Sequence, residues 1–171
     1  MFGHHHDLVR CDCLQPHYSL VNRAEYEREL EPVCLKYGLG VIPYSPLGGG
    51  FLTGKYHRGQ PPPPDSRGAD SPRIQGYMTE KNWALLDKLQ AIGRARGKSI
   101  SQVALAWLLN RPGVTSPIIG PRTIDQYADN MEALKVEITD DDRERIDRII
   151  RRGDSVAPFY EAEFGPHPYR V

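Results

Sequence analysis

Apolar residues recur every three or four positions along several stretches of the chain, a spacing that predicts amphipathic helices. These stretches cover residues 24–37, 79–96, 101–110 and 139–150. Pro32 falls inside the first of them, and we expect a weakening or a break there because proline has no backbone N–H. Thr123 and Thr139 can each cap a first helical turn, so a further helix is expected over residues 124–131.

Short apolar runs alternate with these helices and predict strands within residues 8–21 and at residues 41–44 and 114–119. The first run suggests a short buried strand, with Cys11, Cys13 and Gln15 on one face. The alternation of strands and helices favours an α/β fold with parallel strands. Residues 56–76 are rich in Pro, Gly, Arg and Asp and predict an extended surface loop without a core of its own.

Composition and charge narrow the possible partners. In 171 residues the chain carries 22 Lys and Arg against 22 Asp and Glu, so no net field attracts it to nucleic acid or an anionic membrane. Its apolar runs are too short to cross a bilayer, and no secretory signal is recognisable at the N-terminus. The odd number of cysteines, 3, has no framework spacing. We therefore expect a soluble cytoplasmic domain with no nucleic-acid or membrane partner.

The glycine-rich residues 45–55 follow a predicted strand and form a candidate phosphate site. Glycines there let backbone N–H groups approach a phosphate, and Lys55 can add a positive charge. Gly49, Gly54 and Lys55 match the spacing of a P-loop. However, Tyr56 replaces the hydroxyl residue that would hold magnesium, and the following prolines cannot open the required helix. A P-loop is therefore disfavoured, while a plain turn remains the alternative.

A second candidate site begins where the predicted strand at 114–119 ends. Arg122, Gln126 and Asn130 are four residues apart and would lie along one helix face. An arginine at a helix N-terminus is suited to bind phosphate, although a solvent-exposed polar face is an equal alternative on spacing alone.

Three other patterns favour structural interpretations. The His4–His6 run with Cys11 and Cys13 is compatible with a metal site, but no second ligand pair follows at the usual spacing. The four prolines at residues 61–64 are compatible with a polyproline ligand, and a rigid loop is favoured. Aromatic residues at 159–164 could reach over a pocket, and a surface tail is favoured.

Several motifs occur together in one order: LQPHYSLVNR (14–23), GLGVIPYSPLGGGFLTGKY (38–56), SQVALAWLL (101–109), SPIIGPRT (116–123) and DN (129–130). They resemble the aldo-keto reductases, especially the bacterial kind related to potassium-channel beta subunits. The resemblance implies a partial (β/α)8 TIM barrel, an α/β fold, with strands six to eight and their helices. It divides the chain into an unmatched segment (1–7), an NADP(H)-binding half-barrel (8–151) and an irregular tail (152–171).

The resemblance also implies an extended NADP(H) site. Gln15 would bind the nicotinamide carboxamide, and Tyr44 would stack on the nicotinamide ring. The pyrophosphate loop would comprise Ser45, Pro46, Leu47, Gly48 and Gly49, with Lys55 and Arg67 clamping the phosphates. The adenosine 2′-phosphate and adenine would contact Gly120, Arg122, Gln126, Asp129 and Asn130. Arg122 would favour NADP(H) over NAD(H) by pairing with the extra phosphate.

In this family the catalytic Asp, Tyr, Lys and His belong to the first half of the barrel, so we expect no catalytic residue in this chain. The resemblance implies reduction of a small aldehyde or ketone if an N-terminal half completes the barrel. The alternatives are a non-catalytic NADP(H)-binding or interaction module and an inactive gene remnant. Unpaired strand edges also predict possible self-association.

Overall fold

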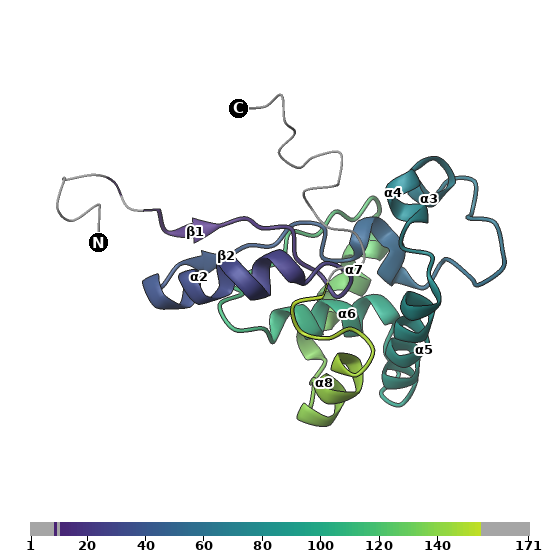
Figure 1. Ribbon diagram of the computed structural model, residues 1–171. Coiled ribbons are helices and arrows are strands. Elements are labelled where there is room, and N and C mark those ends of the chain that lie inside the picture. The colour runs from purple at the N-terminus through teal and green to yellow at the C-terminus, as the bar shows by residue number, and fades with distance from the viewer. Residues whose placement is uncertain (1–8, 10, 155–171) are drawn as a thin grey trace.

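Parallel extended segments run side by side in the structure, a computed structural model that describes residue 9 and residues 11–154 (Figure 1). Strands β1 (Cys13–Leu14) and β2 (Gly40–Val41) pair in parallel, with Cys13 opposite Gly40. Residues 114–118 run parallel on the other side of β2, which they meet at the bridge Val41–Val114, and a second parallel bridge joins Ile118 to Tyr44, three residues after β2. The predicted parallel order is therefore observed, but the third segment is not a continuous strand.

Prolines explain why the strands are so short. Pro16, Pro43 and Pro117 each lie in one of the parallel segments. A proline cannot donate a hydrogen bond to a neighbouring strand, so each one interrupts the ladder. Pairing continues through neighbouring residues, since Ile118 donates its N–H to the Pro43 carbonyl at 2.8 Å.

The first part of the predicted buried strand is exposed, which corrects the sequence-based expectation. Cys11, Cys13 and Gln15 are exposed, and continuous burial begins only at Pro16. β1 forms the edge of the described sheet and pairs with β2 alone. An edge position leaves more of a strand accessible to solvent than a central one.

Helices follow and connect the parallel segments. Their bounds are η1 (a π-helix, Tyr26–Leu30), α2 (Glu31–Tyr37), η2 (a 3-10 helix, Gly48–Thr53), α3 (Arg67–Asp70), α4 (Pro72–Gln75), α5 (Glu80–Arg94), α6 (Ile100–Leu109), α7 (Ile124–Met131), η3 (a 3-10 helix, Glu132–Lys135) and α8 (Asp140–Asp147). Residues 24–37 are helical without interruption, so Pro32 does not break the helix; it stands in the first turn of α2, directly after the π-helical turns of η1. The caps predicted at Thr123 and Thr139 are confirmed, since each side chain accepts an N–H from its helix.

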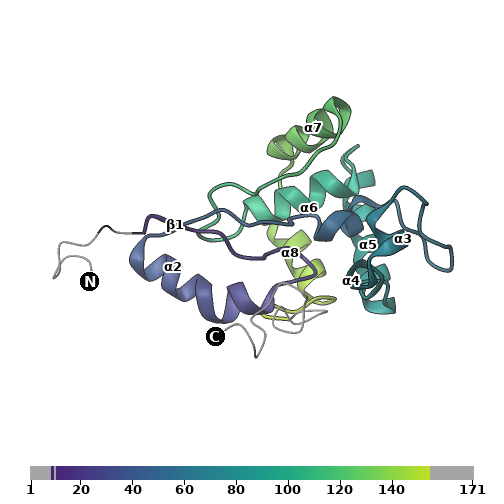
Figure 2. The ribbon, with the colours of Figure 1, turned by 90° about the horizontal axis from the view of Figure 1, so that it is seen from above.

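The core gathers around α6. Residues 101–108 of this helix are all buried, and α6 contacts α5, α7, η2 and η3. Figure 2 shows α7 and α2 on opposite sides of the molecule, with α6 and the parallel segments between them. This arrangement places the start of α7 near the carboxyl ends of the parallel segments.

The loop at residues 56–76 is more structured than the sequence suggested. It contains α3 and α4, and the side chains of Tyr56 and Ile74 are only 3% and 1% exposed. The Tyr56 hydroxyl accepts the Gly68 N–H at 3.0 Å. The prediction of an extended surface loop is therefore wrong, because the segment contains two short helices and Tyr56 and Ile74 anchor it in the main core.

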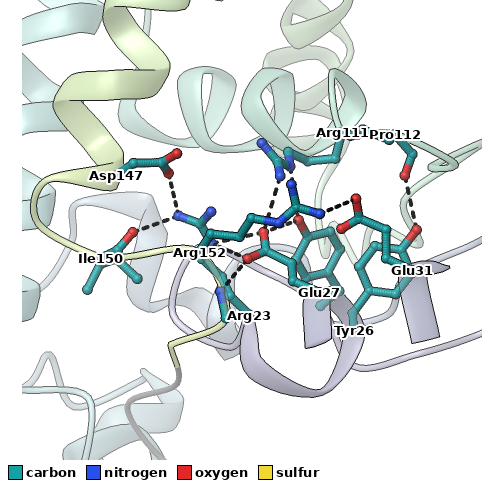
Figure 3. Close-up of polar contacts among 11 residues, drawn as sticks. Arg23, Tyr26, Glu27, Glu31, Arg111, Pro112, Asp147, Ile150 and Arg152 are labelled. Carbon is teal, nitrogen blue, oxygen red and sulfur yellow. Dashed lines mark hydrogen bonds and ion pairs between the residues drawn. The ribbon is translucent and has the colours of Figure 1, made fainter. Parts of the chain in front are cut away.

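A buried arginine connects the two ends of the described chain (Figure 3). Arg23 is fully buried, and its Nε donates to both carboxylate oxygens of Glu27 at 2.9 and 3.0 Å. Its Nη1 donates to Asp147 Oδ1 at 2.6 Å and to the Ile150 carbonyl at 2.7 Å. The segment that precedes η1 is thereby held against the end of α8.

Residues 152–154, placed by the sequence in an irregular tail, form a turn that joins this cluster. Arg152 pairs with Glu31 at 2.7 Å, and the Gly153 N–H donates to Glu27 Oε2 at 2.6 Å. Asp154 accepts the backbone N–H of Arg23 at 3.0 Å. The remainder of the predicted tail, including the aromatic residues at 159–164, lies outside the described residues.

Gly93 allows α5 to approach the turn that follows it. A methyl group at Gly93 would lie 2.4 Å from the Lys98 carbonyl oxygen, a backbone atom that cannot move aside cheaply. We expect Gly93→Ala to reduce the free energy of unfolding by about 1–3 kcal/mol, although alanine favours a helix. Urea denaturation measures the change. Gln90→Ala, at an exposed position of α5, should stay within about 0.5 kcal/mol of wild type, and equal stability of both variants would contradict the steric argument.

Candidate functional site

A groove of about 570 Å³ opens where the parallel segments end and α7 begins. It is lined by all the residues predicted for the NADP(H) site except Gln15 and Gly48. The structure therefore brings together residues from the glycine loop, the start of α3, and residues 118–130, and Tyr44 and Asn130 are 86 positions apart in sequence.

The glycine loop follows β2 and turns sharply at the floor of the groove. Gly48, Gly49 and Gly50 have φ angles of 56°, 64° and 98°, a region that side chains disfavour. Ser45 has a φ of 54° and is the one described non-glycine residue with a positive value. A strained non-glycine residue of this kind is often found at a functional site, and here it directs the chain from Tyr44 into the loop.

Lysine and arginine side chains give the groove its positive charge. Lys55 extends back over the loop, since a methyl group at Gly50 would lie 3.1 Å from its Nζ. Arg67, at the start of α3, and Arg122, before α7, also line the groove. Positive side chains from separate segments in one groove are suited to bind a ligand with several phosphates.

Hydrogen bonds at the start of α7 fix the backbone beside Arg122. The Thr123 hydroxyl accepts the Gln126 N–H at 3.2 Å, and Gln126 Oε1 accepts the Arg122 N–H at 2.8 Å. Arg122 and Gln126 are exposed, so both remain accessible to a ligand. The positive end of the α7 dipole adds to the charge of Arg122.

Asp129 connects α7 to α6. Gln102 Nε2 donates to Asp129 Oδ1 at 2.7 Å, and Ser99 Oγ donates to Oδ2 at 3.2 Å. Ser99 is also the cap of α6. The carboxylate that the resemblance places near adenine therefore holds α7 against α6.

Tyr44 lies at the strand end of the groove, and its ring stacks on His17 at a centroid distance of 5.0 Å. Burial raises the pKa of Tyr44, and the nearby charge of Glu25 acts in the same direction. Burial, with the charge of Arg73, lowers the pKa of His17 to about 4. Both rings are therefore uncharged at neutral pH.

Gln15 and Gly48 are the predicted site residues that do not line the groove. Gln15 is exposed beside β1, and Gly48 is buried, where a methyl group would lie 3.0 Å from Val21 Cγ2. Gly48 thus shapes the loop from its inner side. The sequence reasoning also missed some lining residues, which are Gly50, Thr53, Ser101, Ile118, Ile119, Pro121 and Asp125.

Gly50, Thr53, Ile118, Ile119 and Pro121 fall within the quoted motifs, so their neighbours in sequence gave a usable signal. Ser101 is likewise the first residue of a quoted motif, whereas Asp125 lies outside all of them and reaches the groove through its place in α7.

Within the described part of the chain, no group of three His, Cys, Asp or Glu residues is placed to hold a metal ion. Cys11 and Cys13 are exposed free thiols, while His4–His6 lie outside the described residues. Among residues 9 and 11–154, no helix has the length and apolar character needed to cross a membrane.

Comparison with known proteins gives a consistent result. The profile of the family described as "Aldo/keto reductase family" matches residues 1–151. The chain is 39% identical over 137 residues to a probable voltage-gated potassium channel subunit beta of Oryza sativa subsp. japonica. It is 36% identical over 124 residues to the uncharacterized oxidoreductase YrpG of Bacillus subtilis (strain 168). It is 35% identical over 146 residues to L-glyceraldehyde 3-phosphate reductase of Escherichia coli (strain K12).

These alignments cover most of this chain and a smaller part of each relative. They include 76%, 72% and 82% of the chain, against 40%, 36% and 42% of the respective relatives. The chain thus spans about two fifths of the length of the curated relatives that it matches.

Proposed function

Because this chain belongs to the aldo-keto reductase family, a family with a TIM-barrel fold, we propose that its groove is the NADP(H)-binding part of a carbonyl reductase. The observation that carries the proposal is the convergence of Lys55, Arg67 and Arg122 on one groove that ends at an aromatic ring. NADP(H) has the matching chemistry, because it carries a pyrophosphate, a 2′-phosphate and a planar nicotinamide.

The arrangement of the groove supports one orientation of the cofactor. Tyr44, at the carboxyl end of β2, would lie beside the nicotinamide, and the glycine loop with Lys55 and Arg67 would hold the pyrophosphate. Arg122, at the start of α7, would bind the 2′-phosphate. Asp129 would act indirectly by holding α7 against α6, since its carboxylate accepts hydrogen bonds from Gln102 and Ser99.

We further propose that β1, β2 and residues 114–118 correspond to strands six, seven and eight of a TIM barrel. Ligands of such barrels bind at the carboxyl ends of the strands, which is where the groove lies. The bound nicotinamide would supply a hydride to the carbonyl carbon of an aldehyde or ketone. The proton for the carbonyl oxygen would come from residues of a preceding half-barrel, so this chain would bind and orient the cofactor.

A non-catalytic module that binds NADP(H) is the second candidate. The similarity to a protein named as a probable potassium channel subunit beta favours it, because that name describes a subunit of an assembly. Both candidates require the same cofactor groove, and they differ only in turnover.

Two measurements on the full chain test these candidates. Calorimetric titration with NADPH should show saturable binding. NADPH oxidation is then followed with 4-nitrobenzaldehyde, first for the chain alone and then with the separately produced N-terminal half of the Bacillus subtilis relative. Binding with turnover only in the mixture supports the reductase, and binding without turnover in either supports the module. Absence of NADPH binding would contradict both.

A further inference from the structure

His17 and Tyr44 form a stacked ring pair at the strand end of the groove. Their ring planes are inclined by 16°, with centroids 5.0 Å apart, and a parallel bridge joins their backbones. His17 is only 7% exposed, whereas Tyr44 is partly buried and lines the groove. One face of the phenol ring is therefore covered by protein, and only its other face is available to a ligand.

A buried polar cluster fixes the orientation of the His17 ring. Asn22 Nδ2 lies 3.4 Å from His17 Nε2 and donates to the Tyr77 hydroxyl at 2.8 Å. Asn22 and Tyr77 are 6% and 1% exposed. Because its lowered pKa keeps His17 neutral, Nε2 can accept a hydrogen bond from the Asn22 amide. The cluster thus spans from β1 to the segment before α5.

We propose that His17 is a positioning residue that supports Tyr44 from behind, so that the free face of the tyrosine lies flat against the nicotinamide ring. The inference rests on the proposed function, since it assigns a ligand group to one end of that groove. A ring held from one side loses little rotational freedom when a second planar group stacks on it, which favours binding. The support that His17 gives to Tyr44 should therefore affect the binding only of ligands that carry the nicotinamide.

Two substitutions separate the stacking ring from the hydrogen bond. His17→Phe keeps a planar ring and removes the acceptor for Asn22, whereas His17→Gln keeps a polar partner and removes the ring. We expect His17→Gln to weaken NADP+ binding about 3–10-fold, the size of one aromatic contact, and His17→Phe to stay within about twofold of wild type. Calorimetry with NADP+ gives the dissociation constants.

Binding of 2′,5′-ADP, which lacks the nicotinamide, is the matched control. Both variants should bind it within about twofold of wild type, because its phosphates contact the loop and Arg122 at the other end. In a Tyr44→Ala background, His17→Gln should have no further effect on NADP+.

The outcomes distinguish this inference from the proposed function. Equal losses for NADP+ and 2′,5′-ADP, a stronger loss for His17→Phe than for His17→Gln, or additive effects with Tyr44→Ala would each overturn the role of His17. Wild-type chain that binds neither ligand would instead overturn the proposed function, and this inference with it.

Discussion

Replacing Arg23 with methionine is expected to lower the free energy of unfolding by about 3–5 kcal/mol, the cost of removing one partner from a buried ion pair. Glu27 is 5% exposed and accepts hydrogen bonds from Arg23, Tyr18 and Gly153. Methionine matches the length of arginine but leaves this carboxylate without its closest positive charge. Urea denaturation followed by circular dichroism gives the free energy of unfolding.

The consequences extend beyond one pair because Arg23 also packs on Trp107. Its guanidinium lies 5.0 Å from the indole centroid, and that of Arg111 lies 5.2 Å from the same ring. Arg111 also approaches Glu27 at 3.5 Å. In the Arg23→Met variant the positive charge of Arg111 still stabilises the Glu27 carboxylate. The expected loss of unfolding free energy therefore lies toward the lower end of the range given for Arg23→Met.

An exposed pair provides the control for this prediction. Arg145 pairs with Asp141 at 2.7 Å, but both side chains are more than half exposed, so Arg145→Met should cost less than about 1 kcal/mol. The double variant Arg23→Met with Glu27→Leu should recover part of the stability, since it removes the buried carboxylate that Arg23→Met leaves without its main partner; the recovery is partial because Arg111 loses its ion pair with Glu27. A loss under about 1 kcal/mol for Arg23→Met would contradict the assigned role.

The parts of the fold that were predictable depend on neighbours in sequence. Thr123 and Thr139 cap the helices that follow them, because a cap is made by residues three positions apart. Pro32 marks the start of α2 for a similar local reason. The prolines in the parallel segments can also be read from the sequence. A continuous strand was nevertheless predicted over residues 114–119, where Pro117 leaves only isolated bridges.

Contacts between distant residues were not predictable from these patterns. Arg23 and Asp147 are 124 positions apart, and a charged residue in an amphipathic pattern is ordinarily assigned to the surface. The anchoring of residues 56–76 was not predicted for a related reason. Their composition, rich in proline and glycine, is typical of an exposed loop and gives no sign that Ile74 is buried by distant residues. The positions of most groove residues followed from the family motifs, whereas the link from Asp129 to α6 required the packed structure.

The positive side chains of the groove should contribute differently to the binding of two related cofactors. We expect Arg122→Leu to weaken NADPH binding by about 10–100-fold, the loss of one or two charge-assisted hydrogen bonds, and to change NADH binding less than about threefold. The reason is that Arg122 lines the groove at the start of α7, where the proposed orientation places the 2′-phosphate.

Lys55→Met should behave in another way, because the pyrophosphate is common to both cofactors. We expect it to weaken the binding of NADPH and of NADH by a similar factor of about 5–20, since Lys55 reaches back over the glycine loop.

Calorimetric titration of Arg122→Leu and Lys55→Met with each cofactor gives four dissociation constants. Arg148→Leu, at a 77% exposed side chain directly after α8 and outside the groove lining, should leave all affinities unchanged. Equal losses of NADPH and NADH for Arg122→Leu would contradict the proposed 2′-phosphate contact, and a selective loss of NADPH for Lys55→Met would reverse the orientation of the cofactor in the groove.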